Sequence, residues 1–145
     1  MHTEPMNLAS LSWSALATTV FVSFVGGFLW FGPKTFFPVW WRAMGKSEAE
    51  IPGGKDGMAL VFGLTLLGIV VQNAVLGLII GMSSELTPAS GAFTGFVAGT
   101  GLAAFSSLSH RMFAGQGLKV WLIEVTSDVV NLTLAGAVFG WFGKP

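Results

Sequence analysis

Four long apolar runs dominate this sequence and limit what the chain can fold into. None of them is interrupted by proline, and they cover residues 11–31, 57–82, 90–113 and 118–142. A helix of roughly 20 residues crosses the hydrocarbon core of a bilayer, which is about 30 Å thick. Strands of a membrane barrel would instead alternate polar and apolar residues in short segments. The runs therefore predict four transmembrane helices.

The composition also indicates a membrane protein. Of 145 residues, 52% are hydrophobic and only 10% are charged, whereas a soluble domain carries about 25% charged residues. The mean hydropathy is +0.72. No low-complexity tract or long polar linker divides the chain, so we expect a single membrane domain over residues 1–145. The predicted fold class is an all-α membrane protein, a four-transmembrane-helix bundle with a short interfacial segment after the first helix.

The distribution of Lys and Arg predicts the orientation, because cytoplasmic loops are enriched in cations. Six of the seven basic residues lie in or beside the loops after the first and third runs: Lys34, Arg42, Lys46, Lys55, Arg111 and Lys119. The C-terminal tail holds only Lys144. The tail before residue 11 has no cation, so we expect a retained span rather than a signal peptide, which needs a positive region there. We predict a multi-pass protein of the bacterial inner (cytoplasmic) membrane with both termini periplasmic.

Residues 34–46, K-T-F-F-P-V-W-W-R-A-M-G-K, are too few to cross a membrane. The segment mixes cations with aromatic residues, which favour the headgroup level. We expect it to lie on the cytoplasmic surface, with interfacial side chains Trp30, Trp40, Trp41 and Arg42. The alternative is a tight re-entrant loop packed on the bundle.

Small residues recur every four positions in two of the runs, and such residues let helices approach closely in membranes. The third run has Gly91, Gly95, Gly99 and Ala103, followed by Ser107, and the first has Ala15, Thr19, Ser23 and Gly27. We favour contacts inside the chain's own bundle. The alternative is a homo-oligomer interface.

A polar stripe interrupts the fourth run. Glu124, Asp128 and Asn131 stand at positions i, i+4 and i+7, which share one face of a helix. Asp128 is near the middle of its span, where an aspartate costs about 3 kcal/mol in contact with lipid. We therefore expect a buried acidic stripe that faces the bundle interior, a subunit interface or a water-filled cavity.

Possible partners of the stripe are the polar residues at similar depth: Gln72, Asn73, Ser107, Arg111 and Lys119. We expect Glu124 to be ionised and paired with Arg111 or Lys119. We expect Asp128 to be hydrogen-bonded to the amides, and its protonation state is left open. Two interpretations remain: the stripe lines a path for a proton, cation or polar solute, or it fixes helix register or contacts another subunit.

Other chemistry has little support in the sequence. There is no cysteine, and His2 and His110 have no second metal ligand at a recognised spacing, so we expect no metal and no cofactor. Glu124 and Asp128 lie on one helix and point the same way, instead of flanking a substrate. The net charge is zero, so nucleic acid is not expected as a partner. We predict that the protein is not an enzyme.

Several motifs resemble one known family. They are G-F-L-W-F-G-P at 27–33 with F-P-V-W-W-R-A-M-G-K at 37–46, then S-H-R-M-F at 109–113, G-L-K-V-W-L-I-E at 117–124 and A-G-A-V-F-G-W-F at 135–142. The chain resembles the domain-of-unknown-function 1761 family. That resemblance implies a small bacterial membrane protein with four spans, and it supplies no substrate or catalytic residue. Family members often carry Asn where this chain has Glu124.

The sequence thus predicts an integral membrane protein surrounded by membrane lipid. We expect a structural or accessory subunit of a larger membrane complex, or a homo-oligomer. The alternative is a small channel or transporter subunit for protons, cations or a small polar solute.

Overall fold

A computed structural model describes residues 5–145, and these form helices and loops without any strand. The helices are α1 (Trp13–Trp30), α2 (Phe37–Ala43), α3 (Gly57–Gly81), α4 (Pro88–Val97), α5 (Phe105–Phe113) and α6 (Gly117–Phe142), with the short helices η1 (Leu8–Ser10) and η2 (Gly54–Asp56) and the π-helical segment η3 (Ala98–Ala104). α4, η3 and α5 are continuous, so Pro88–Phe113 is one span. Four helices are long and apolar enough to cross a membrane. The predicted four-helix architecture is confirmed.

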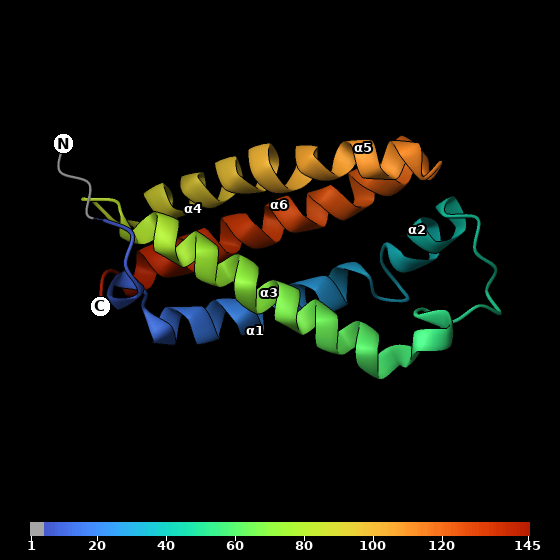
Figure 1. Ribbon diagram of the computed structural model, residues 1–145, viewed down its shortest axis with the longest axis horizontal. Helices are drawn as coiled ribbons and strands as arrows, with labels where there is room; N and C mark the ends of the chain where they lie inside the picture. The colour runs from blue at the N-terminus through green and yellow to red at the C-terminus, as the bar shows by residue number, and fades with distance from the viewer. Residues whose placement is uncertain (1–4) are drawn as a thin grey trace.

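α6 is the centre of the bundle. It contacts α1, α3, α2 and the whole span formed by α4, η3 and α5. The first described residues and the C-terminus lie at one end of the bundle, on the left in Figure 1, which we call the terminal end. α2 and residues 44–56 lie at the other end, which we call the loop end.

Two apolar clusters hold the helices together. The larger one joins Leu11, which follows η1, with α1, α3 and α6 toward the terminal end. Its buried members are Leu11, Ala15, Leu16, Leu76, Ile80, Leu132, Ala135 and Phe139. The smaller cluster joins η3 and α6 toward the loop end and contains Ala104, Trp121 and Val125. The bundle is therefore most tightly packed at its terminal end.

The α4–α6 contact is backbone against backbone. A Cβ atom added at Gly91 would clash with the carbonyl oxygen of Gly136, and one added at Gly95 would clash with that of Leu132. Gly99 lies against the Cα atom of Val129. Such close approach maximises dispersion contacts between helices in lipid. The glycine stripe of the third span thus packs inside the chain's own bundle.

The π-helical segment η3 keeps this span facing α6. In a straight α-helix, residues four apart drift by about 40° per step, because each residue advances about 100°. A π turn contains more residues, since its hydrogen bonds close over five residues, and it rotates the following side chains back. Ala104 consequently still faces α6, and its carbonyl accepts a hydrogen bond from Trp121 Nε1 at 3.0 Å.

The small-residue stripe of α1 is only partly as predicted. Ala15, Thr19 and Ser23 are buried. A Cβ atom added at Gly27 would meet nothing within 4 Å, and its neighbour Gly26 contacts Asn131 instead. Twelve residues at 100° each exceed three full turns by about 120°. α1 has no π turn to correct this drift, so the prediction that Gly27 packs against a helix is wrong.

α3 is packed along only half of its length. Its buried residues all lie from Asn73 onward, and residues 57–72 bury no side chain. Figure 1 shows this half diverging from α6 toward the loop end. The diverging half is apolar on all sides apart from Thr65 and Gln72, so lipid can solvate most of it.

Candidate functional site

The polar stripe of α6 runs from the loop end to the middle of the helix. Its three members, Glu124, Asp128 and Asn131, have three different environments. Glu124 is in a network of charged and aromatic side chains, Asn131 packs against α1, and Asp128 is exposed. The stripe is thus not uniformly buried.

Glu124 joins three helices. Its Oε2 atom lies 2.7 Å from Nε of Arg111 at the end of α5, and its Oε1 atom accepts a hydrogen bond of 2.9 Å from Trp40 Nε1 on α2. The Glu124 side chain is 15% exposed and that of Arg111 is 38% exposed. Lys119, the other predicted cation, is exposed and makes no ion pair within the described chain. Arg111 also donates to Gln116 Oε1 at 2.6 Å, which fixes its position.

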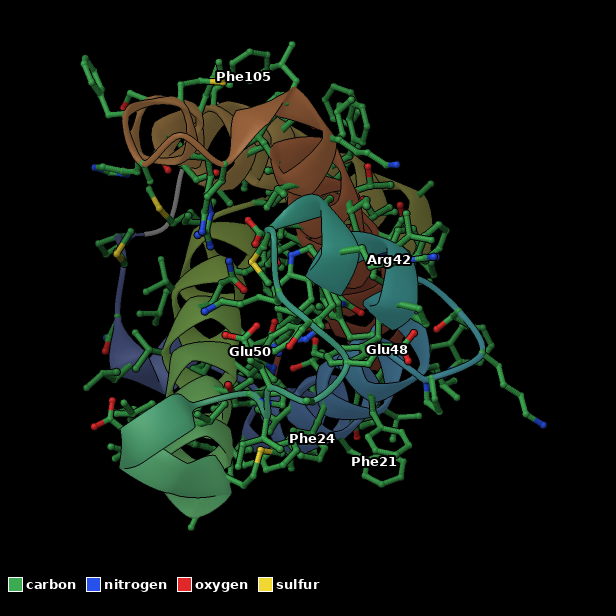
Figure 2. All side chains as sticks on the ribbon, turned by 90° about the vertical axis from the view of Figure 1, so that its right-hand side faces the viewer. Phe21, Phe24, Arg42, Glu48, Glu50 and Phe105 are labelled. Carbon is green, nitrogen blue, oxygen red and sulfur yellow. The ribbon has the colours of Figure 1, made fainter. Side chains whose placement is uncertain are left out.

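α2 packs onto the loop end of the bundle. The Trp40 bond joins α2 to α6, and the buried Trp41 of α2 donates to the carbonyl of Ser47 at 2.8 Å. At the end of α1, Trp30 donates to the carbonyl of Ile123 on α6 at 3.0 Å. Figure 2 looks onto this end and shows α2 between α5 above and α1 and α3 below. Arg42 is exposed. All three tryptophans thus donate hydrogen bonds to other residues of the same chain. The position of residues 34–46 at a membrane surface stays a prediction.

Asp128 differs from the sequence prediction. It is exposed on the surface of the chain, and it has no hydrogen-bond partner among the described residues. The expected amide partners are elsewhere: Asn73 is buried and donates to Ser23 Oγ at 3.1 Å, and Gln72 is exposed. The physical reason is the divergence of α3, whose residues 57–72 leave this face of α6 uncovered. Asp128 therefore bonds to neither amide of its own chain and does not face the bundle interior, and the other two expected surroundings, a subunit interface or a water-filled cavity, stay predictions.

Asn131 lies against α1. Its Nδ2 atom donates to Ser127 Oγ at 3.4 Å, one turn earlier on α6. Its Oδ1 atom occupies the space where Gly26 lacks a side chain. Ser107, which we predicted near the stripe, instead donates to the carbonyl of Ala104 at 2.8 Å on its own helix. The stripe thus has satisfied polar groups on both sides of Asp128.

Two hollows on the described surface lie away from the stripe. One of about 520 Å³ lies at the loop end beside Trp41, Lys46 and Glu50. The other, about 290 Å³, lies between α1 and α3 and is lined by apolar side chains that include Phe24 and Leu66. Figure 2 shows Glu50 close to the middle of the loop end. In residues 5–145, no three His, Cys, Asp or Glu side chains gather closely enough to hold a metal ion.

The comparisons with known proteins give a family and no activity. A family model described as "Protein of unknown function (DUF1761)" matches residues 14–140. The chain belongs to this family. The DUF1761 match covers α6 up to Gly140 and so includes the whole polar stripe. No curated protein and no solved structure matches the chain.

Three contacts in this DUF1761 chain differ from what its sequence predicts. The sequence predicts Trp40 at the headgroup level, but Trp40 donates a hydrogen bond to Glu124. It predicts Ser23 in helix packing, and Ser23 also accepts a hydrogen bond from Asn73. Gly26 was not singled out, although it receives Asn131. The signal for Asn73 was present, because Ser23 and Asn73 both lie at intermediate depth in antiparallel spans. No sequence signal distinguishes Trp40 as a hydrogen-bond donor to α6.

Proposed function

We propose that this protein is an accessory or structural subunit of a membrane assembly, and that the Asp128 face of α6 is its contact with another protein. We place it in the bacterial inner membrane with both termini in the periplasm, because its cations gather at the loop end. The observation that carries the proposal is the exposure of Asp128 in the middle of a span, without a partner in the described chain.

Thr126 lies two residues before Asp128 on α6 and is also exposed. The Thr126 hydroxyl donates to the carbonyl of Leu122 at 2.6 Å, so its own helix satisfies it. A carboxylate cannot be satisfied in this way, because the carbonyls of its own helix are acceptors as well. An aspartate facing lipid at this depth costs about 3 kcal/mol. A neighbouring protein that donates a hydrogen bond to Asp128 removes that cost.

The packing of the terminal end favours a contact over a conduction path. Apolar side chains fill the bundle there, with Ala135 and Phe139 continuing α6 beyond the stripe. The acidic residues of the stripe lie between the loop end and the middle of α6. A path through a single copy would need a polar route past this cluster, and the cluster members are all apolar.

The test is the mass and composition of the particle extracted gently from its native membrane, for the natural chain and three variants. We expect Asp128→Leu to release the neighbouring protein and Asp128→Asn, which keeps a hydrogen-bonding group, to weaken the assembly only modestly. Thr126→Leu is the matched control and should leave the particle unchanged. A particle that keeps its composition in Asp128→Leu would contradict the proposal. An intact Asp128→Asn particle that has lost an ion flux would assign the stripe to conduction instead.

A further inference from the structure

We infer that the neighbour at Asp128 is a second copy of this chain, and that Gln72 of each copy is hydrogen-bonded to Asp128 of the other. This inference rests on the proposed function, because it names the partner that covers the Asp128 face. It follows from a second unsatisfied polar group in the same chain and from the depths of the two groups.

Gln72 is the second unsatisfied group. It is exposed in α3, and no hydrogen bond to it is present among the described residues. Thr65, Ser106 and Thr126 are also exposed within the spans, but each donates to a carbonyl of its own helix. Gln72 and Asp128 therefore both lack a hydrogen-bond partner among the described residues, and both lie near the middle of a span. An amide facing hydrocarbon without a partner is costly.

The two groups lie at compatible depths. α3 and α6 both run from the loop end to the terminal end, and an atom added at Gly77 would touch the Phe139 ring. Gln72 precedes Gly77 by five residues and Asp128 precedes Phe139 by eleven. The Phe139 ring extends from its Cα atom toward the loop end, because side chains tilt toward the N-terminus of their helix. At 1.5 Å per residue, the Cα atoms of Gln72 and Asp128 therefore differ by less than about 9 Å along the bundle. A two-fold axis along the membrane normal leaves these depths unchanged in a dimer. The two side chains and a hydrogen bond of about 2.9 Å span that difference.

The chemistry of the two groups is complementary in either protonation state of the acid. The Gln72 amide donates to an ionised carboxylate, and its oxygen also accepts from a protonated one. Two-fold symmetry forms the bond twice, because each copy supplies one amide and one acid. The diverging half of α3, residues 57–72, packs against none of the chain's own helices closely enough to bury a side chain. A neighbouring copy can therefore lie beside it and reach Asp128.

The sequence contains no cysteine, so only cysteines introduced by substitution can form a disulfide between copies. Two differently tagged chains, one with Gln72→Cys and one with Asp128→Cys, are produced in the same membrane and oxidised. We expect a disulfide that joins one chain of each tag. The control pair is Val71→Cys with Val130→Cys, whose native side chains are 54% and 42% exposed. Equal cross-linking of both pairs, or none in either, would overturn the inference.

A second measurement avoids cysteine at these positions. Energy transfer between labelled copies is followed in vesicles of bacterial phospholipid as the protein is diluted with lipid. Losing two hydrogen bonds should weaken dimers about 10- to 300-fold in Gln72→Leu and in Asp128→Leu, and the double variant should be no weaker than either. Val71→Leu is the matched control and should dimerise normally. Additive losses, or dimers that are unaffected, would refute the pairing.

The outcomes separate the inference from the proposed function. A monomer in vesicles, together with a native particle that contains a different protein and loses it in Asp128→Leu, overturns the second copy and leaves the proposed function standing. A monomer in vesicles and an unchanged native particle overturn both. A dimer with coupled Gln72 and Asp128 supports both.

Discussion

Gly136→Ala should separate α4 from α6. The added Cβ atom would overlap the carbonyl oxygen of Gly91 and lie 2.7 Å from its carbonyl carbon, whereas ordinary contact begins near 3.4 Å. The helices must therefore move apart by more than about 0.7 Å. Both obstructing atoms belong to helix backbone and cannot rotate away. A gap of this size forfeits roughly a quarter to a half of the dispersion energy of the neighbouring atom pairs. The expected overpacking cost is about 2–3 kcal/mol.

The control is Gly68→Ala in the diverging half of α3, where nothing lies within 4 Å of the added atom. Both substitutions replace a helical glycine and gain similar helix propensity, about 1 kcal/mol, so their difference isolates the contact. The free energy of unfolding is measured by titrating detergent-solubilised protein with dodecyl sulfate and following circular dichroism. We expect Gly136→Ala to be less stable than Gly68→Ala by about 2–3 kcal/mol. A difference below about 0.5 kcal/mol would show that the backbone contact does not carry the stability assigned to it.

Two further predictions concern polar contacts. Trp40→Phe removes the donor to Glu124 and should make α2 exchange its amide hydrogens faster, while Trp13→Phe, at an exposed indole, should not; unchanged exchange in α2 would refute the anchoring role. Asn73→Ala and Ser23→Ala should each lower the free energy of unfolding by about 0.6–2 kcal/mol and should be non-additive when combined. Additive losses in that cycle would mean that the bond between the two side chains contributes nothing.

The spans were predictable because the physical requirement is simple. An apolar run long enough to cross a bilayer can be recognised without knowing which helices pack against it. The four predicted runs agree with the helices to within two residues at each end. The depth of each residue along its span predicts two possible cationic partners for Glu124, Arg111 and Lys119. The choice of Arg111 over Lys119 depends on which way α5 and α6 face each other, which only the folded chain decides.

The exposure of Asp128 was not predictable, because it depends on the path of another helix. α3 is apolar on nearly every side, so its sequence does not reveal which half packs. The π turn in the third span was equally hidden, since Ala98–Ala104 contains only small residues and one leucine. The drift that moves Gly27 out of contact follows from helix geometry. Applying that geometry to α1 would have identified Gly26.

The glycine contact between α4 and α6 has a consequence for how this sequence can vary. Glycine has no side chain, so forming this contact costs no side-chain conformational entropy. There is also no apolar side chain at these positions that another of similar size could replace. The complementarity of the contact depends on the absence of a Cβ atom, so substitutions at these glycines have no conservative choice. The diverging half of α3 has the opposite property, because any apolar side chain of ordinary size satisfies lipid there. Substitutions should therefore accumulate along residues 57–71 long before they reach Gly91, Gly95 or Gly136.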